Sequence, residues 1–322
     1  MRLATFNIES LGGSPKRGAP IEERIAVLRP QLERLGADIL CLQEINTRKE
    51  DGIRRPLDLL ALVEGTGYSS HAIDISSGPK GDGPADVHNL VVLSRYPVLE
   101  REDIRQSLVV PPSWRRQTAE PPDAAPFPVT WDRPVQRVVL GLPNGIRLHV
   151  FNVHLRAPLA AAVPGQKSGP FAWKSVSGWA EGFFLSAMKR TGQALELRLA
   201  VERVFDAEPD ALVTVCGDFN AEDHDTALRL ACAGEDDTGS GRLAARVLTP
   251  LDRSLPADRR FTVIHHGRPQ MLDHLLASRT LFGRLRSLQI HNEMLEDELV
   301  AYGRIDRPPE SLHAPMVAEF AL

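Results

Sequence analysis

The ten residues 211–220, ALVTVCGDFN, carry an apolar run directly into a polar cluster. A short apolar run that ends at a glycine is typical of a buried β-strand, so residues 211–216 are predicted to form one. Asp218 and Asn220 then stand just beyond that strand. An Asp-X-Asn pair by itself is more often part of a turn than of a functional site. The interpretation therefore depends on whether other strands end in the same way.

Other predicted strands do end in acids, amides and imidazoles. Residues 3–8 contain Asn7, with Glu9 shortly after, and residues 38–42 are followed by Glu44. A rigid sheet edge can hold such groups in a fixed arrangement. We therefore expect one polar site to form from the following residues: Asn7, Glu9, Glu44, Asn152, His154, Asp218, Asn220, Asp273 and His313.

Most of these residues have an ordinary structural explanation when they are taken one at a time. Asn7 and Asn152 suit turns, Glu44 suits a solvated face, and His154 suits a partly buried structural position. Asp273 is different, because it interrupts an apolar run and an unpaired buried carboxylate is costly. It needs a partner, and a histidine would serve. The structural explanation is strong for each residue and weak for the set.

The rest of the chain alternates strands with helices. Helices are predicted at residues 21–35, 57–63 and 187–205, with a kink or break at Pro30. Pro143-Asn144-Gly145 signals a hairpin turn. Further strands are predicted at residues 89–93, 135–140, 146–153, 261–264, 271–276 and 315–320. The chain has no repeat and no linker, so we predict one α+β domain over residues 1–322, built on stacked sheets.

Composition limits the function classes. The 322 residues carry 38 basic and 42 acidic side chains, a net charge of −4, so no overall basic footprint for nucleic acid exists. Three cysteines cannot form a fully paired disulfide framework, and a reducing compartment is expected. No apolar run approaches the length of a membrane span, so we expect a cytoplasmic protein without stable membrane association. The sequence does not indicate an oligomeric state.

The polar strand ends, taken in order, resemble the endonuclease/exonuclease/phosphatase superfamily. The matching motifs are Thr5-Phe6-Asn7-Ile8, Leu42-Gln43-Glu44, Asn152-Val153-His154-Leu155, Gly217-Asp218-Phe219-Asn220, Leu272-Asp273-His274 and His313-Ala314-Pro315, and the run NLVVLSRYP at 89–97 is common in its phosphatase and phosphodiesterase branches. The resemblance covers nearly the whole chain. It implies a two-sheet β-sandwich flanked by helices, a four-layer α/β/β/α fold, and metal-dependent hydrolysis of a phosphoester.

The resemblance also implies a role for each acid and amide. Glu44 is the principal metal ligand, with Asn7 close by and Glu9 where some relatives carry a second acidic ligand. These oxygen ligands favour Mg²⁺, with Mn²⁺ as a substitute. Asp218 aligns or deprotonates the attacking water, and Asn220 donates to a phosphate oxygen.

The histidines take the remaining roles that the resemblance implies. His313 and Asp273 form a pair that activates water or holds the phosphate. His154 binds the phosphate or protonates the leaving oxygen. A histidine at this position resembles the pancreatic-type deoxyribonuclease, sphingomyelinase and inositol-phosphatase branches, whereas abasic-site endonucleases usually carry Asn.

One position departs from the family pattern. The family usually ends in Ser-Asp-His, and this chain reads Ser311-Leu312-His313. Leucine can neither position the histidine nor contact a second metal. A nuclease or other phosphodiesterase is the first interpretation, so the expected partner is a phosphoester substrate such as a nucleic acid or nucleotide. The alternatives are a phosphomonoesterase acting on a nucleotide, sugar or lipid headgroup, and a binding module that has lost catalysis.

Substrate contacts are predicted from two segments. Residues 157–182 look like an irregular insert that follows His154 directly, and Arg156, Trp173 and Trp179 in or beside it combine basic and aromatic character. Such residues can contact phosphate and stack a base, although the aromatic residues could equally pack the insert onto the sandwich. Arg95, in the shared run at 89–97, is also assigned to the substrate.

Overall fold

Two six-stranded sheets form the centre of the computed structural model, which describes residues 1–12, 19–305 and 308–322. The first sheet has the order β17 (Leu285–Ile290), β18 (Met316–Phe320), β1 (Arg2–Leu11), β2 (Ile39–Ile45), β6 (Asn89–Ser94) and β5 (Ala72–Ile75). The second has the order β13 (Leu248–Pro250), β16 (Asp273–Ser278), β12 (Leu212–Asp218), β11 (Arg147–His154), β10 (Val135–Gly141) and β7 (Val98–Ile104).

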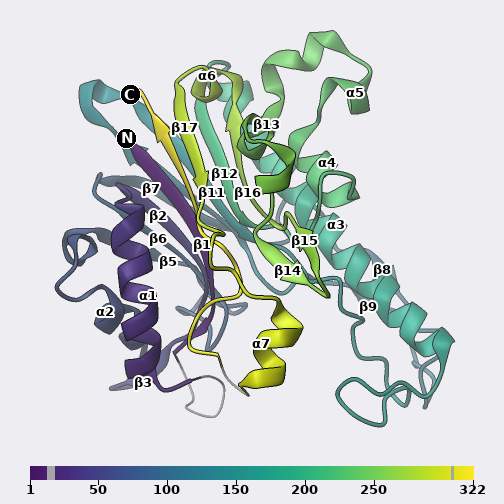
Figure 1. The fold of residues 1–322 in the computed structure, drawn as a ribbon. Coiled ribbons are helices and arrows are strands. Elements are labelled where there is room, and N and C mark those ends of the chain that lie inside the picture. Colours follow the sequence, from purple (N-terminus) through teal and green to yellow (C-terminus); the bar gives the residue numbers. More distant parts are fainter. Residues whose placement is uncertain (13–18, 306–307) are drawn as a thin grey trace.

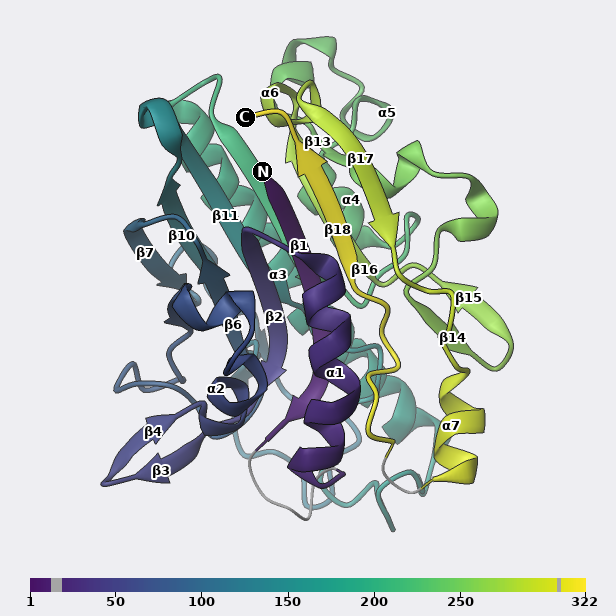
Figure 2. The ribbon, with the colours of Figure 1, turned by 60° about the vertical axis from the view of Figure 1, so that its left-hand side comes forward.

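Helices cover the outer faces of both sheets (Figure 1). The helices are α1 (Ile21–Leu35), α2 (Leu57–Val63), α3 (Val176–Ala207), α4 (Thr226–Cys232), α5 (Glu235–Thr238), α6 (Arg279–Phe282) and α7 (Glu298–Arg304). Figure 2 shows α1 lying across the face of the sheet that contains β1 and β2. Three small hairpins complete the fold, β3 (Arg48–Glu50) with β4 (Ile53–Arg55), β8 (Ser113–Trp114) with β9 (Phe127–Pro128), and β14 (Val263–His265) with β15 (Arg268–Gln270).

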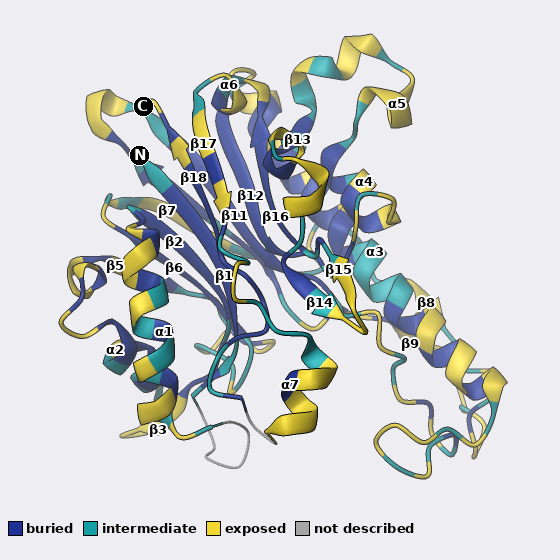
Figure 3. Cartoon of the chain, viewed as in Figure 1, coloured by how far each residue is buried: buried dark blue, intermediate teal, exposed yellow. Residues whose placement is uncertain are grey.

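Apolar side chains form three main layers of core. One lies between the sheets, where Cys41 and Val92 of the first sheet share a cluster with Val150 and Cys216 of the second. A second layer packs α1 and α2 on the first sheet, and a third packs α3 and α4 on the second. Figure 3 shows that the strands of both sheets are largely buried. This α/β/β/α arrangement confirms the predicted fold class.

Helix α1 has the predicted bounds and runs through Pro30 without a break. Its buried face presents Leu28, Leu32 and Leu35 to the first sheet. The helix ends at Gly36, whose φ of 52° is the left-handed conformation that glycine adopts readily. Burial of the apolar face therefore outweighs the hydrogen bond that proline removes.

Helix α3 is longer than predicted, because it begins at Val176 rather than at residue 187. The predicted irregular insert is thus wrong for residues 176–182, and Trp179 lies on the helix. Ser175 caps the helix by accepting a hydrogen bond from the Gly178 N–H. Glu181, buried on this first part of the helix, accepts hydrogen bonds from Trp114 Nε1 and from the loop that follows it. The first turns of α3 are held by contacts with a loop that is distant in the sequence. Local hydrophobic periodicity therefore does not reveal where the helix begins.

Four strands of the large sheets were not predicted, namely β5, β7, β13 and β17. Strand β7 reads VLEREDI and is mostly exposed at a sheet edge, so it lacks the apolar run on which the prediction depended. The predicted hairpin at Pro143-Asn144-Gly145 does join two paired strands, β10 and β11.

Candidate active site

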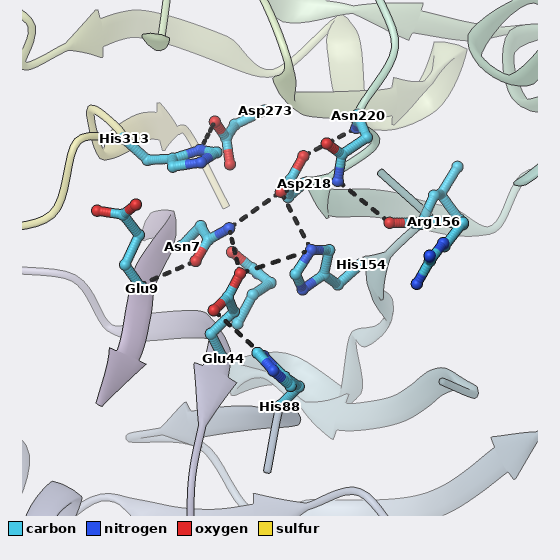
Figure 4. A network of polar contacts seen from close by, with 12 residues as sticks. Asn7, Glu9, Glu44, His88, His154, Arg156, Asp218, Asn220, Asp273 and His313 are labelled. Carbon is cyan, nitrogen blue, oxygen red and sulfur yellow. Dashed lines mark hydrogen bonds and ion pairs between the residues drawn. The ribbon is translucent and has the colours of Figure 1, made fainter. Parts of the chain in front are cut away.

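The predicted polar residues meet at one end of the two sheets. Strands β1 and β2 run parallel, so Asn7 and Glu44 lie at the same edge of the first sheet. Strands β11 and β12 are also parallel, with His154 opposite Asp218, and antiparallel β16 places Asp273 opposite Asp218 on the other side. Figure 4 shows these side chains facing a common cleft, to which His313 comes from the segment before β18.

Irregular backbone aims several of these side chains. The register shifts between Asn7 and Leu11 where β1 pairs with β2, and Glu9 has a φ of 47° there. Glu44, with a φ of 65°, lies at a second shift between β2 and β6. Left-handed non-glycine residues cost about 1–3 kcal/mol each and cluster at functional sites. These bulges redirect the carboxylates away from the regular alternation of the strands.

Gly217 is required for the approach of β12 to β11 just before Asp218. Its φ is 131°, and a Cβ at this position would lie 1.9 Å from the Val153 carbonyl oxygen. No other residue fits there without displacing the strand. The glycine of the quoted stretch therefore positions the carboxylate that follows it.

Glu44 is held as a carboxylate. The Ser10 N–H donates to its Oε2 at 3.0 Å, and His88 Nδ1 lies 3.2 Å from the same oxygen. Burial favours the neutral acid, but the hydrogen bond with His88 and the electrostatic effects of His154, His88 and Arg133 outweigh it, so the pKa of Glu44 is well below its usual range. A group that stays ionised suits cation binding.

Asp218 has the opposite character. Asn7 Nδ2 donates to its Oδ2 at 3.0 Å, and the Asn220 N–H donates to its Oδ1 at 2.8 Å. Burial and the neighbouring charge of Asp273 raise the pKa of Asp218 to about 7, against the opposing effect of His313. Two carboxylates at one edge thus have different affinities for a proton, as an acid–base site requires.

His313 and Asp273 form a buried pair. His313 Nδ1 lies 2.8 Å from Asp273 Oδ2. Burial lowers the pKa of His313, but the charge of Asp273 and this hydrogen bond outweigh it, so the pKa is raised well above its usual value. The second oxygen of Asp273, Oδ1, is buried and has no hydrogen-bond partner among the described residues. An unsatisfied buried carboxylate oxygen beside the cleft fits a bound water, cation or substrate donor.

His154 lies between the two acidic groups. Its Nε2 is 3.3 Å from Asp218 Oδ2 and 3.8 Å from Glu44 Oε1. Burial and the charge of Arg133 lower the pKa of His154 well below its usual value. Asn220 Nδ2 donates to Asp218 and to the Leu155 carbonyl, which fixes the amide beside His154.

Glu9 faces a different neighbour from the one predicted. Figure 4 shows its carboxylate pointing towards His313 rather than towards Glu44. The Leu312 N–H donates to Glu9 Oε2 at 2.6 Å, while the Leu312 side chain is buried. Burial raises the pKa of Glu9, and the charge of Glu44 adds to this effect. The predicted metal ligands therefore do not face a single point, because Glu44 lies on one side of Asn7 and Glu9 lies on the other (Figure 4).

These residues fit a divalent cation by the chemistry of their donors. Carboxylate and amide oxygens are the ligands that Mg²⁺ and Mn²⁺ prefer. Two groups of described residues each bring three ligand atoms within 4.8 Å of one another, namely Glu9, Glu298 and His313, and Asp218, Asp273 and His313.

Several residues near the site were not predicted from the sequence. Arg133 lies two residues before β10, donates to the His154 and Leu155 carbonyls, and acts electrostatically on Glu44 and Asp218. Its position at the start of an antiparallel strand, which lies at the same edge, could have identified it. His88 precedes β6 in the same way. Glu298, on α7, has no comparable signal in the sequence.

Arg95 does not lie in this site, so its assignment to the substrate is corrected. Strand β6 runs antiparallel to β2, with Asn89 opposite Ile45 and Ser94 opposite Ile39. Arg95 therefore lies at the far end of the sheet, about 20 Å along the strand, where it pairs with Asp38 at 2.7 Å. The direction of β6 was not evident from its own sequence.

The other predicted substrate residues lie in different places. Arg156 lies near the site (Figure 4), Trp173 belongs to the small apolar cluster of the insert, and Trp179 lies on α3. Arg156 follows β11 and contacts Asp132 at 3.3 Å. Trp173 packs against the small apolar cluster under the insert, with the Lys167 ammonium 4.9 Å from its ring centroid. Trp179 is 44% exposed on α3 and stacks on Phe183. Trp173 is therefore accounted for by its packing role, whereas the exposed Trp179 is not.

The sequence of the chain also matches a known protein family. Residues 4–293 match the model of the Endonuclease/Exonuclease/phosphatase family. The chain belongs to this family. The predicted resemblance is thereby confirmed, and as a member of this family the protein is a phosphoester hydrolase of a class that generally depends on a divalent metal. No curated protein sequence matches it.

Solved structures share the fold at low sequence identity. A truncated TDP2 from Caenorhabditis elegans is 16% identical, with a TM-score of 0.56 and coverage of 100% of this chain and 97% of that one. An AP endonuclease from Archaeoglobus fulgidus is 16% identical, with a TM-score of 0.55 and full coverage of both chains. An endonuclease/exonuclease/phosphatase from Bacteroides vulgatus is 17% identical, with a TM-score of 0.59 and coverage of 100% and 98%. Among the described residues, no helix is both long and apolar enough to cross a bilayer.

Proposed function

We propose that the protein hydrolyses phosphodiesters, as a nuclease or a related phosphodiesterase, by in-line attack of water on phosphorus. The observation that carries this proposal is the position of Asp218 between two sets of groups. Asn7 and His154 contact it on one side, and the Asp273–His313 pair faces it on the other. A scissile phosphate in this cleft would meet a base, imidazoles and amide donors at once.

Asp218 is the proposed base for the attacking water. Its raised pKa of about 7 suits a group that must accept a proton near neutral pH. The Asn7 amide and the Asn220 N–H hold the carboxylate in place. Preorganised donors of this kind avoid the cost of reordering during the reaction.

The imidazoles act on the phosphate. His313, kept protonated by Asp273, offers a positive charge to the phosphate oxygens. His154 contacts the phosphate or donates to the leaving oxygen. The Asn220 amide, whose two hydrogens go to Asp218 and the Leu155 carbonyl, would release one of them to donate to a phosphate oxygen. Arg133, which acts electrostatically on Glu44 and Asp218, supplies a further positive charge.

Glu44 and Asn7 are the proposed ligands of a divalent cation, with Glu9 nearby. Mg²⁺ is the proposed ion, with Mn²⁺ as a substitute, because the donors are hard oxygens. When bound, the cation polarises a phosphoryl oxygen and neutralises charge in the transition state.

A diester is favoured over a monoester by the charge of the cleft. The cleft brings together several carboxylates, those of Glu9, Glu44, Asp218 and Asp273. A phosphomonoester carries about −1.5 to −2 charges at neutral pH, whereas a diester carries one. These carboxylates repel the monoester more strongly than the diester, whereas His313, Arg133 and a bound cation attract both. Arg156 and the exposed Trp179 are proposed to contact the rest of the substrate, a nucleic acid or nucleotide.

The test compares two chromogenic substrates that differ in charge. We expect Mg²⁺-dependent hydrolysis of bis(p-nitrophenyl) phosphate, faster than that of p-nitrophenyl phosphate, and no turnover with EDTA. Glu44→Gln should abolish turnover, whereas Glu296→Gln, at an acid paired with Arg304, should not. Faster hydrolysis of the monoester would favour a phosphatase, and cation binding without any turnover would favour a binding module. A panel of DNA, RNA, nucleotides and lipid phosphodiesters then identifies the natural class.

A further inference from the structure

Helix α7 carries a carboxylate to the cleft from outside the six motifs. Asp297 caps the helix, its Oδ1 accepting the Leu299 N–H at 2.9 Å, and a bridge pairs Asp297 with Ile264 of β14. Figures 1 and 2 both place α7 below the β14–β15 hairpin. Its first residue, Glu298, is therefore held at a defined position relative to β14.

Glu298 lies beside Glu9 and His313. A carboxylate oxygen of each acid and a ring nitrogen of His313 lie within 4.8 Å of one another. Two further contacts fix this arrangement. His265 Nδ1 lies 2.6 Å from Glu298 Oε2, and the Tyr302 hydroxyl donates to Glu9 Oε1 at 3.4 Å. Helix α7 thus reaches both carboxylates.

The spacing of these groups suits one ion. The nearest carboxylate oxygens of Glu9 and Glu298 lie within 4.8 Å of one another, which leaves room for a cation at about 2.0–2.6 Å from each. Two carboxylates this close repel each other, and Glu44 adds to the negative charge around Glu9. Arg24 acts on Glu9, but it also donates to the Ile8 carbonyl. A divalent cation would neutralise both acids.

Leu312 explains why such a replacement matters. Relatives of this family usually carry an acid there, whereas this chain contributes only the Leu312 N–H, which binds Glu9. We propose that Glu298 takes the place of that missing acid, so that the carboxylates of Glu9 and Glu298 bind a divalent cation in the cleft. This inference rests on the proposed phosphoester site and adds a ligand to it from a different part of the chain.

Titration of the full chain with Mn²⁺, followed by calorimetry, tests the proposal. We expect Glu298→Gln to weaken Mn²⁺ binding at one site by at least about 10-fold, the lower end of losses seen when the surroundings of a metal are altered. Glu296→Gln is the matched control, because Glu296 is an exposed acid on the same segment that pairs with Arg304. Equal binding by the wild type and Glu298→Gln would overturn the proposal.

Two more variants separate the possible failures. His265→Gln removes the partner of Glu298 but keeps the carboxylate, so it should bind Mn²⁺ nearly as the wild type does. A loss as large as that of Glu298→Gln would show that the position of α7, not its carboxylate, matters. Glu44→Gln tests the proposed function. If Glu44→Gln loses Mn²⁺ binding and Glu298→Gln does not, only this inference fails, whereas absence of binding to the wild type would contradict both.

Discussion

Two His–Asp pairs lie on opposite faces of β16 and differ in what they leave unsatisfied. Asp273 faces the cleft and pairs with His313, whereas the next residue, His274, faces away and contacts Asp252 at 3.5 Å. His274 Nε2 also meets the Ala221 carbonyl at 2.9 Å, so both of its ring nitrogens have partners. Asp273 keeps one buried oxygen that has no hydrogen-bond partner in the described part of the chain. The saturated pair, His274 with Asp252, has both ring nitrogens bonded and suits a structural role. The unsaturated pair, His313 with Asp273, keeps this acceptor at the site and suits catalysis.

His313→Gln should have the largest effect on activity. Glutamine retains a donor for Asp273 but cannot carry a positive charge. We expect kcat on bis(p-nitrophenyl) phosphate to fall by about 10²–10⁴-fold, the scale of general acid–base catalysis. Because Asp273 is fully buried, the free energy of unfolding, measured in urea, should fall as well, so kcat is compared for the folded protein. An unchanged kcat would show that the His313–Asp273 pair is not catalytic and does not differ in role from the His274–Asp252 pair.

His274→Gln is the matched change on the other face of β16. It removes the charge from a fully buried pair and leaves Asp252 poorly satisfied. We expect the free energy of unfolding to fall by about 1–3 kcal/mol, while kcat of the folded protein stays near that of the wild type. A selective loss of kcat without a loss of stability would contradict the structural role of this pair.

Asp273→Asn should lower kcat less than His313→Gln, because Asp273 acts through the histidine. If the two residues work as one unit, the double variant should be scarcely worse than His313→Gln alone. The measurement is a double-mutant cycle on kcat. Effects that add in free energy would show that the pair does not act as a unit.

The saturated pair should also give stability a defined pH dependence. Burial opposes ionisation of both groups, but their mutual contact outweighs it, so the pKa of His274 is raised and the pKa of Asp252 is lowered. The histidine stabilises below its unfolded pKa, about 6.5, and the aspartate above its unfolded pKa, about 3.9. The pair's contribution is therefore greatest between these values. It is lost as pH rises through the folded pKa of His274 or falls through that of Asp252.

Urea unfolding across this range, with Asp252→Asn as the reference, measures the contribution. The difference in unfolding free energy between wild type and variant should narrow at both ends of the pH range. A constant difference would show that Asp252 and His274 do not titrate as a linked pair.

Trp179→Ala should have the smallest effect. The side chain is partly exposed beside Phe183, so its loss should raise KM for an oligonucleotide a few-fold while leaving bis(p-nitrophenyl) phosphate unaffected. Trp173→Ala is the contrast, because it should lower the melting temperature through lost packing. Equal KM changes for both substrates would exclude a role for Trp179 in substrate contact.

The sequence by itself located the strands that carry the site. Apolar runs and the polar residues that follow them are local features, so β1, β2, β11, β12 and β16 were all predicted to within about three residues of their observed bounds. The convergence of their ends then follows from the packing of strands into sheets. Helix α1 was equally readable, because Leu28, Leu32 and Leu35 repeat at helical spacing.

Only the tertiary structure decided the rest of the site. Arg95 was misplaced because strand direction depends on which strands pair, and the start of α3 was missed because a distant loop buries Glu181. Arg133 and Glu298 reach the cleft from elements whose own sequences carry no catalytic pattern. Their roles depend on contacts between residues far apart in the chain, such as Glu298 and Glu9. Local periodicity cannot encode such contacts, because they are set by how separate elements pack.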